Sequence, residues 1–424
     1  MRVLWIVNVP LPDVCKSRSI KGIYGGGWMQ SLLEAILDET NIDMAVATPF
    51  QCENVLIEEH NNVRYYLVPG GEKSKHKVRE CFNKEWKNVI DDFKPDIIHC
   101  HGSEYAHTLT ILKNKGLIPA MVSIQGLIGP YAEEYYAGIS VKDIIANYTL
   151  KDLIRKTGIF ACKNEMEKRG KLERDIFANC DMIVGRTQWD KAHAFEMNHN
   201  AQYRTNNESL RKEFYECEKW SIDKKENNAI FISQATYPIK GFHKLIEAVA
   251  ILKQKNIECN VKVAGSNIFG NNIKSLTSKI KDTGYSKYVK KLIERYGLED
   301  KIEFLGTLNA QQVATQLQKS HVFVVPSSIE NSPNSLGEAM IIGVPSIASY
   351  VGGVPSIVKD DECILYPFND AAMLAKAIYD VFTNDDIALK LSSNAKKRAL
   401  KTHDKTKNLA DLLKIYEELA LLKK

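Results

Sequence analysis

The chain has 424 residues, of which 44% are hydrophobic and 26% are charged, and its formal net charge at pH 7 is +5. This length and composition are typical of a globular protein with two or three domains, and the mild charge gives no indication of a nucleic-acid partner. No apolar run approaches the roughly 20 residues that span a bilayer, which excludes a helical integral membrane protein.

The N-terminal segment MRVLWIVNVPLP predicts a first β-strand over residues 3–9. It lacks the long hydrophobic region and small-residue cleavage site of a signal peptide, so a cytoplasmic protein is expected. Gly25, Gly26 and Gly27 follow, in front of a helix expected from about Trp28 to Asp38. Glycines at this place form either a plain turn or a loop that lets a phosphate approach the free amides of the helix.

Five more apolar runs predict strands in the first half: IDMAVATP, VRYYLVP, PDIIHCHG, PAMVSIQG and CDMIVGRT. Runs of this kind, separated by helices, predict a parallel α/β sheet. The triplet HCH resembles a metal cluster, but on a strand His99 and His101 share one face while Cys100 points to the other. The nine cysteines are scattered and never spaced C-x-x-C, which fits reduced thiols.

The stretch 150–175 is basic, with eight Lys or Arg residues against five Asp or Glu residues. Such a stretch is typical of a solvated helical face. The alternative is a partly amphipathic surface that rests on anionic lipid.

Residues from about 200 to 227 are polar and irregular, and a second series of strands and helices begins at AIFISQ. We therefore predict an N-terminal Rossmann-like domain over 1–205, a linker over 206–227 and a second Rossmann-like domain over 228–403. The remaining residues, 404–424, are expected to form a C-terminal helix that returns to the first domain.

Open parallel sheets bind ligands at the carboxyl ends of their strands, and the conspicuous polar segments of this chain follow predicted strands. One of them, YPIKGFHKLIEA, places Lys240 and Gly241 at the start of a helix. A lysine there is disfavoured by the helix dipole unless an anion is bound, and the alternative is a solvated surface lysine.

Another such segment, SSIENSPNSLGEAM, carries two acids, Glu330 and Glu338. Ser335 and Glu338 have the spacing of a capping box, in which both side chains satisfy free helix amides. On that interpretation Glu338 is structural, whereas Glu330 has no capping role.

Taken together, these segments resemble the retaining glycosyltransferases of family 4, which have the GT-B architecture of two Rossmann-like domains facing a central cleft. The resemblance rests on PIKGFHKLIEA, on SSIENSPNSLGEAMIIGVPSIASYVGGVPSIV, and on PDIIHCHG with the glycine loop. GRTQWD and NNESLRKEFYE look like marks of a subgroup for surface-polysaccharide or lipopolysaccharide biosynthesis. The resemblance implies retaining transfer of a sugar from a nucleotide-diphosphate-sugar to a hydroxyl of a glycan or lipid-linked saccharide.

The resemblance also implies roles for single residues. Glu330 would accept hydrogen bonds from hydroxyls of the donor sugar, His101 would lie beside that sugar, and Lys240 would neutralise the leaving diphosphate. Glu338 would bind both ribose hydroxyls, since a carboxylate can receive a vicinal diol. The rest of the implied donor-binding set is Gly26, Gly27, Gln234, Gly241, Gly265, Asn334, Ser335 and Leu336.

The chain departs from the family pattern in two places. Many members carry an Arg five or six residues before the lysine, where this chain has Gln234 and Ala235. Either Gln234 and backbone donors suffice for the diphosphate, or another base such as Arg186 or Arg211 reaches it. Gln125 stands where relatives often have His.

No two aspartates have D-x-D spacing, so we expect no metal and no cofactor beside the donor. Lys240, backbone amides and helix N-termini would then stabilise the leaving group. The alternatives are a nucleotide-sugar epimerase of the same fold and a non-catalytic nucleotide-sugar binding protein; a dehydrogenase is disfavoured because no G-x-G-x-x-G turn follows a strand. A polyprenyl-linked acceptor would explain the basic 150–175 surface and would place the protein at the inner face of the cytoplasmic membrane. A soluble sugar acceptor is equally compatible with the sequence.

Overall fold

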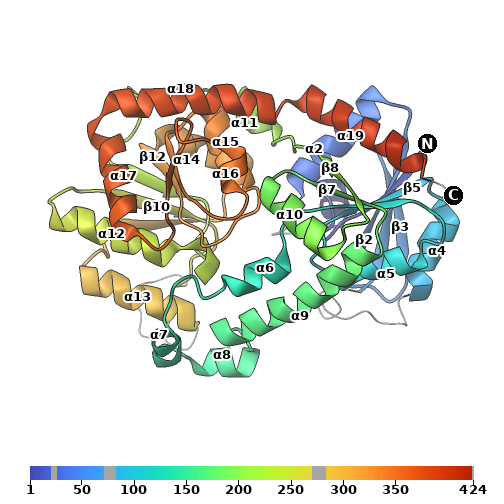
Figure 1. Cartoon of the computed structure of the whole chain (residues 1–424), viewed down its shortest axis with the longest axis horizontal. Helices are drawn as coiled ribbons and strands as arrows, with labels where there is room; N and C mark the ends of the chain where they lie inside the picture. The colour runs from blue at the N-terminus through green and yellow to red at the C-terminus, as the bar shows by residue number, and fades with distance from the viewer. Residues whose placement is uncertain (21–25, 71–82, 270–282, 423–424) are drawn as a thin grey trace. The chain divides into compact units, whose positions relative to one another are not determined.

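The computed structural model describes residues 1–20, 26–70, 83–269 and 283–422. These residues form two compact α/β units (Figure 1). Unit 1 consists of Met1–Pro130, Glu167–Arg211 and His403–Lys424, and unit 2 consists of Tyr131–Met166 and Lys212–Thr402.

Unit 1 is built on an eight-stranded sheet with the order β3-β4-β2-β1-β5-β6-β7-β8. All neighbours are parallel except the edge pair β3 and β4. The strands are β1 (Arg2–Ile6), β2 (Asp43–Phe50), β3 (Leu56–His60), β4 (Val63–Pro69), β5 (Ile97–His101), β6 (Ala120–Ser123), β7 (Met182–Gly185) and β8 (Gln202–Thr205).

Helices cover both faces of this sheet, as the alternation along β1 requires. Leu4 and Ile6 belong to one apolar core, and Val3, Trp5 and Val7 belong to the other. The helices are α1 (Pro12–Ser17), α2 (Gly27–Glu39), α4 (Asn83–Phe93), α5 (Ala106–Asn114), α10 (Gln188–Met197) and α19 (Lys405–Ala420). Two more helices, α6 (Ile128–Glu133) and α9 (Ile159–Ala178), belong partly to unit 1 and partly to unit 2. The C-terminal helix α19 packs beside α2 in the second core (Figure 1).

Unit 2 is built on a six-stranded parallel sheet with the order β11-β10-β9-β12-β13-β14. Its strands are β9 (Ala229–Ile232), β10 (Asn260–Ala264), β11 (Ile302–Gly306), β12 (Val322–Val325), β13 (Ser346–Ser349) and β14 (Ile364–Tyr366). Its helices are α7 (Val141–Ala146), α8 (Leu150–Arg155), α11 (Lys212–Glu216), the 3-10 turn η2 (Pro238–Lys240), α12 (Phe242–Gln254), α13 (Gly284–Tyr296), α14 (Ala310–Lys319), α15 (Asn334–Ile342), α16 (Val354–Ile357), α17 (Ala371–Thr383) and α18 (Asp385–Thr402).

The structure moves two of the boundaries expected from the sequence. Residues 131–166 group with unit 2, although the prediction assigned them to the first domain. Most of the expected linker, from Lys212 on, also belongs to unit 2, because Trp220 is buried and its backbone amide donates to the Ile342 carbonyl at 2.9 Å. The C-terminal helix groups with unit 1, where the chain crosses over at residue 403.

Three strands were not expected. β3 carries the polar sequence LIEEH, β8 lies in the segment that we expected to be irregular, and β14 has only three residues. All three are edge strands, where one side has no neighbouring strand and a long apolar run is not required. None of the helices in the described ranges is long and apolar enough to cross a membrane.

Candidate functional site

The segments that carry the motifs of unit 2 meet at one point of its sheet. From β9 the chain proceeds outward through β10 to β11, and it then returns to the other side of β9 with β12. Open α/β sheets bind ligands at such a switch point, outside the carboxyl ends of the strands. The loop after β9 carries Gln234 and leads to Lys240, and the loop after β12 carries Glu330.

Lys240 and Glu330 form an ion pair at this switch point. The Lys240 Nζ atom donates to Glu330 Oε1 at 2.6 Å, and the Ser327 hydroxyl donates to the same oxygen at 2.7 Å. The Glu330 side chain is 9% exposed and the Lys240 side chain 23% exposed. The anion that offsets a lysine at the start of a helix is therefore, in this structure, the carboxylate of Glu330.

Two glycines let the surrounding loops approach closely. Gly241 has φ +67°, and a Cβ atom there would lie 1.5 Å from the Pro326 carbonyl oxygen. Gly352 has φ +49°, and a Cβ atom would lie 2.1 Å from the carbonyl oxygen of Glu330, which also accepts a hydrogen bond from the Gly353 amide at 2.9 Å. Both positions require glycine for their conformation and for the space, and they fix the backbone on either side of the ion pair.

The helix α15 begins directly after this loop, and it has no capping box. Pro333 is the N-cap residue and offers no side-chain hydrogen bond, while Asn334 and Ser335 are the first helical residues. The capping interpretation of Ser335 and Glu338 is therefore wrong, because the helix begins one residue before Ser335. Glu338 is a buried residue of α15.

The amides expected to face a diphosphate are those of Asn334, Ser335 and Leu336. The first amides of a helix have no acceptor within the helix. The Leu336 amide, however, donates to the Pro333 carbonyl at 3.0 Å, so it is occupied in this structure. For the amides of Asn334 and Ser335, the expected contact with a diphosphate stays a prediction.

Gln234 and Gly265 lie next to each other at the carboxyl ends of β9 and β10. A Cβ atom on Gly265 would be 3.9 Å from Gln234 Cγ. The Gln234 side-chain amide donates to the Tyr237 hydroxyl at 3.1 Å. The place of the missing arginine is therefore filled by a neutral hydrogen-bonded amide.

A segment that the sequence assigned elsewhere also supports this loop. The Tyr131 hydroxyl accepts a hydrogen bond from the Asn331 amide at 2.7 Å, and the Glu134 carbonyl accepts one from the Ser328 hydroxyl at 3.1 Å. A further contact joins His243 Nε2 of α12 to the Ala137 carbonyl at 2.8 Å. Residues 131–137 thus buttress the loop that carries Glu330.

Unit 1 has a switch point of its own, between β1 and β5. The loops that follow these strands are joined by a hydrogen bond from the Asn8 side-chain amide to Glu104 Oε2 at 3.1 Å. Gly26, with φ +83°, is the N-cap of α2, and Gly27 is its first residue. A Cβ atom on Gly27 would lie 3.4 Å from Arg211 Cδ, so Arg211 packs against the start of this helix. Gly25 lies outside the described residues.

His101 is the last residue of β5 and is 3% exposed. As expected for a strand, His99 and His101 share one face, with ring centroids 3.8 Å apart, while Cys100 packs in the opposite core. Neither ring nitrogen of His101 has a hydrogen-bond partner. Burial lowers the pKa of His101 to about 3, so its ring is neutral at physiological pH.

The neighbour His99, in contrast, is fully hydrogen-bonded. One ring nitrogen pairs with the Tyr416 hydroxyl at 2.8 Å and the other with the Ser123 hydroxyl at 2.7 Å. Tyr416 also accepts a hydrogen bond from Trp5 Nε1 at 2.8 Å. The C-terminal helix thereby fixes the ring on which His101 packs.

These histidines line a small cavity of about 30 Å³ in unit 1, enough for one or two water molecules. It also touches the carboxyl ends of β6 and β7 and reaches Arg186. The Arg186 guanidinium pairs with Glu208 at 3.2 Å, and Glu208 accepts a hydrogen bond from the Gln125 amide at 3.1 Å. Gln125, one of the two departures from the family pattern, and Arg186, a candidate substitute for the missing arginine, thus meet on one carboxylate in unit 1.

A second buried acid in unit 1 has a perturbed pKa. Glu173 of α9 accepts hydrogen bonds from the Ser103 hydroxyl and from the Ile128 and Gly129 amides at 2.7, 3.1 and 3.0 Å. Burial raises the pKa of Glu173 to about 7 in spite of these bonds. No sequence motif pointed to this residue, because its partners come from two other segments, one at Ser103 and one at residues 128–129.

Within the described residues, no group of three or more His, Cys, Asp or Glu side chains is placed to hold a metal ion. The predicted site residues are thus distributed over both units. Gly26, Gly27 and His101 belong to unit 1, and the others belong to unit 2.

Comparison with known proteins supports the resemblance. Residues 215–398 match the family described as glycosyl transferases group 1. The putative colanic acid biosynthesis glycosyltransferase WcaL of Escherichia coli is 29% identical over 158 residues, which cover 35% of this chain and 35% of that protein. The match therefore spans about a third of the length of this curated relative.

Solved structures resemble the chain over nearly its whole length. Sucrose-phosphate synthase from Thermosynechococcus elongatus superposes with a TM-score of 0.68 at 17% identity, covering 99% of both chains. Anabaena HepE, solved in complex with UDP-glucose, superposes with a TM-score of 0.67 at 13% identity, covering 99% of this chain and 100% of that one. The chain has the GT-B fold, and through residues 215–398 it is similar to the glycosyl transferases of group 1.

Proposed function

We propose that the protein transfers a sugar from a nucleotide-diphosphate-sugar to a hydroxyl of a glycan or lipid-linked saccharide, with retention of the anomeric configuration. The observation that carries this proposal is the Lys240–Glu330 ion pair at the switch point of unit 2. It supplies a cation for a diphosphate and a carboxylate for sugar hydroxyls on neighbouring loops. The family match over residues 215–398 and the UDP-glucose bound in HepE support a donor of this class.

Donor binding would rearrange the ion pair. Lys240 would turn from Glu330 to the diphosphate oxygens, and the amides of Asn334 and Ser335 would bind the same group at the N-terminus of α15. Glu330 would then accept hydrogen bonds from the sugar, and Glu338 would accept those of the ribose. Gln234, Gly241 and Gly265 would border the nucleotide.

The transfer would proceed on one face of the sugar, through an oxocarbenium-like state. The bond from the anomeric carbon to the phosphate oxygen breaks, and the bond to the acceptor oxygen forms. The proton of the acceptor hydroxyl passes to the departing phosphate oxygen, so the enzyme supplies no general base, and the acceptor oxygen itself is the nucleophile. The neutral His101 of unit 1 would orient the sugar, and Gly26 and Gly27 would face phosphate. Lys240 and the helix amides would stabilise the leaving group electrostatically, without a metal.

We further propose that the acceptor is a polyprenyl-linked saccharide of a surface polysaccharide and that the protein works at the inner face of the cytoplasmic membrane. The relative WcaL carries a name from colanic acid biosynthesis, and the basic stretch 150–175 suits an anionic surface.

The test begins with a thermal-shift screen of nucleotide sugars, because a ligand of the native state raises the melting temperature. The best donor is then incubated with and without membrane-extracted lipid-linked saccharide. We expect nucleoside diphosphate to be released in quantity only with acceptor, and the product to show the anomeric configuration of the donor by NMR. Conversion of the donor sugar without acceptor would identify an epimerase, and binding without any turnover would identify a binding protein; either result would contradict the proposal.

A further inference from the structure

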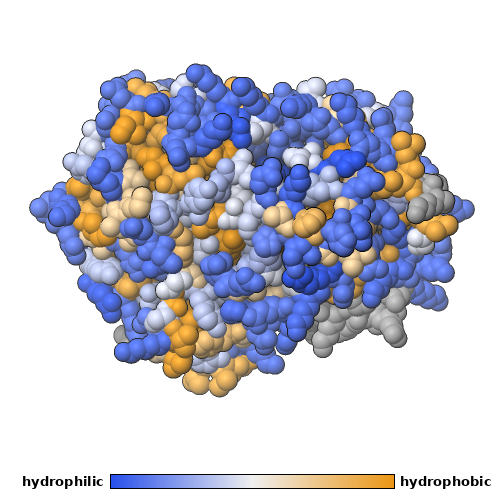
Figure 2. Space-filling view, viewed as in Figure 1, coloured by the Kyte–Doolittle hydropathy of each residue, from blue (hydrophilic) through white to orange (hydrophobic). Residues whose placement is uncertain are grey.

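The helices α7 and α8 of unit 2 carry an unusual concentration of exposed apolar side chains. Among the described residues, 17 large hydrophobic side chains are exposed, and six of them fall within residues 141–154. These six, which we call the α7–α8 patch, are Val141, Ile145, Tyr148, Leu150, Leu153 and Ile154. Figure 2 shows hydrophobic side chains at the surface in the region of these helices, at the bottom of the view.

The patch is arranged on helix faces. Val141 and Ile145 are four residues apart on α7, and Leu150 shares one face of α8 with Leu153 and Ile154. Leu150 and Ile154 are each 78% exposed. Scattered single apolar residues are normal on a protein surface, but a contiguous set of this kind indicates an interaction site.

The orientation of α8 is fixed by a buried carboxylate. The face of the helix that carries this acid packs against unit 2, and the apolar face is exposed to solvent. Asp152 is fully buried, and its Oδ2 atom accepts hydrogen bonds from the Thr149 hydroxyl at 2.8 Å and from the Gly284 amide at 2.7 Å. A Cβ atom on Gly284 would lie only 2.9 Å from that oxygen. The leucine and isoleucine side chains therefore face outward because Asp152 holds the opposite face against α13.

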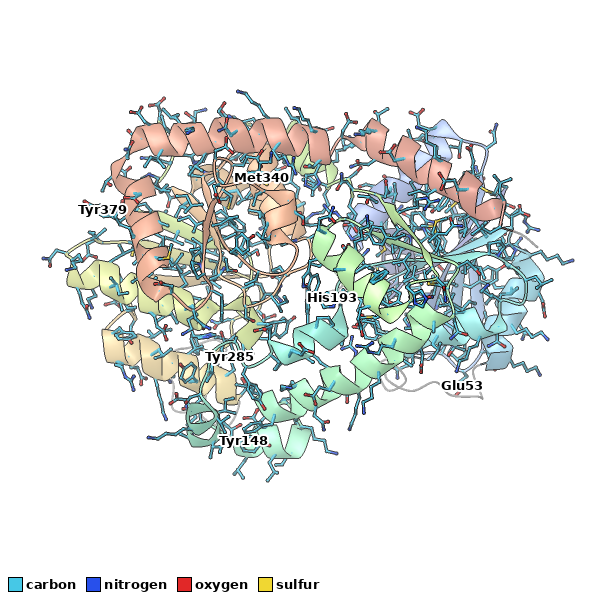
Figure 3. The ribbon with its side chains drawn as sticks, in the orientation of Figure 1. Glu53, Tyr148, His193, Tyr285, Met340 and Tyr379 are labelled. Atoms are coloured by element: carbon cyan, nitrogen blue, oxygen red, sulfur yellow. The ribbon has the colours of Figure 1, made fainter. Side chains whose placement is uncertain are left out.

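The charges around the patch are mostly positive. Residues 141–163 contain five Lys or Arg residues and two Asp residues, one of which is the buried Asp152. Lys142 and Arg155 are exposed on the same two helices. Tyr148, labelled in Figure 3, stands in the chain between the end of α7 and the start of α8, and its side chain is partly exposed. An aromatic residue and basic residues at the border of aliphatic ones are typical of segments that lie in a membrane interface.

We propose that the α7–α8 patch is a membrane-docking surface that inserts its aliphatic side chains into the interface of an anionic bilayer while Lys142 and Arg155 bind lipid phosphates. Charge complementarity favours this occupant over a protein, because aliphatic side chains with a cationic border match a lipid layer with anionic headgroups. The inference rests on the membrane contact proposed above. It places that contact at residues 141–156, a segment that begins nine residues before the basic stretch 150–175.

The test measures binding of the full chain to vesicles by sedimentation, without donor or acceptor, so that its outcome does not depend on transferase activity. The vesicles are phosphatidylcholine alone or mixed with phosphatidylglycerol. We expect binding to the anionic vesicles, and we expect Leu150→Ser/Ile154→Ser to weaken it at least about tenfold. Leu117→Ser/Leu400→Ser removes side chains of similar exposure, 78% and 60%, and should leave binding unchanged.

The electrostatic contribution to vesicle binding is tested with Lys142→Gln/Arg155→Gln. This variant should bind roughly tenfold more weakly at low salt, and the difference should be smaller at 1 M salt. The control Lys255→Gln/Lys397→Gln removes two exposed lysines elsewhere in unit 2 and should have little effect. All four substituted positions are exposed, and circular dichroism verifies that each variant is folded.

Failure of the wild-type protein to bind anionic vesicles, or equal binding by the patch variant, would overturn the inference while leaving the transferase proposal intact. A dimer in light scattering that the patch variant dissociates, together with no vesicle binding, would overturn it in favour of contact between two copies of the chain.

Discussion

The two units place their candidate site residues at equivalent points of their sheets but build them in opposite ways. In unit 2, Lys240 and Glu330 carry opposite charges and hold each other, with Ser327 as a third partner. In unit 1, His101 is neutral, buried and without a hydrogen-bond partner, beside a small cavity. In the first arrangement the charged groups pair with each other, whereas in the second no protein group in the part of the chain that the structure describes pairs with either ring nitrogen.

This difference indicates which kind of ligand group the side chains of each unit can bind. A paired charge at a helix start must exchange partners when an anion binds, so unit 2 is suited to a charged donor whose binding offsets the loss of the ion pair. No protein group among the described residues pairs with the His101 ring, so a hydroxyl, either of a water in the adjacent cavity or of a sugar, can form a hydrogen bond with it. Under the proposed function, that hydroxyl would belong to the sugar.

The largest effect is expected from removing the charge of Glu330. In Glu330→Gln the sugar loses a charge-assisted acceptor in the transition state, and we expect kcat for transfer to fall about 10²- to 10³-fold. The measurement is acceptor-dependent release of nucleoside diphosphate. Glu247→Gln alters another ion pair of unit 2, that with Lys244 at 3.0 Å, and should keep kcat. Near-normal turnover of Glu330→Gln with the preferred donor would contradict the assignment.

The next effect concerns the backbone of the paired site. Gly241→Ala places a Cβ atom against the Pro326 carbonyl at a positive φ, and we expect the free energy of unfolding to fall by roughly 2–4 kcal/mol. Gly306→Ala is the matched control, since its φ is also positive, +73°, but an added Cβ would meet nothing within 4 Å. Its cost should be about 1–2 kcal/mol. Equal losses for both variants in urea unfolding would show that the close approach to Pro326 is unimportant.

A smaller effect distinguishes the neutral site of unit 1. Burial lowers the pKa of His101 to about 3, below the unfolded value of about 6.5, so the unfolded chain takes up a proton that the folded chain does not. The stability linked to this residue is therefore complete above about pH 6.5 and is lost as the pH falls toward 3.

In His101→Phe we expect the loss of stability between pH 6.5 and pH 4.5 to become shallower, by up to about 1.4 kcal/mol per pH unit. Urea unfolding at several pH values measures this slope. His199→Phe changes an exposed histidine and should keep the wild-type slope. An unchanged slope in His101→Phe would mean that the pKa of His101 is the same in the folded and unfolded chains, which would contradict its lowering by burial.

The smallest effect concerns the buttress of the Glu330 loop. Tyr131→Phe leaves the Asn331 amide without the hydroxyl that accepts its hydrogen bond, and we expect unfolding to become easier by about 1–2 kcal/mol. Tyr379→Phe, at an exposed tyrosine, should change stability by less than about 0.5 kcal/mol. The same stability in both variants, measured by urea unfolding, would remove Tyr131 from the support of this loop.

Much of the fold could be predicted from the sequence, because buried parallel strands are short apolar runs and helices separate them. The polar edge strands β3 and β8 could not, since their solvent-facing sides need no apolar pattern. The assignment of residues 131–166 to unit 2 was also beyond reach, because it depends on hydrogen bonds such as that of Tyr131 with Asn331, which no periodicity encodes.

The candidate site likewise contains residues that the sequence indicates and contacts that only the structure shows. Glu330, Lys240 and Gly241 stand in local motifs whose residue types indicate their chemistry. The support of His101 by His99 and Tyr416 joins residues more than 300 positions apart, so no local pattern could indicate it. Ser327 lay within a quoted motif, yet its bond to Glu330 required the structure.

The most direct test of the account is calorimetric titration of the preferred nucleotide sugar and of its nucleoside diphosphate alone into three proteins: wild type, Lys240→Gln and Glu330→Gln. The account predicts that Lys240→Gln weakens both ligands, because both carry the diphosphate. It predicts that Glu330→Gln weakens only the nucleotide sugar and leaves the diphosphate bound as well as before or better, because Lys240 is released from its ion pair. Wild-type affinity of both variants for both ligands would contradict a donor site built on Lys240 and Glu330.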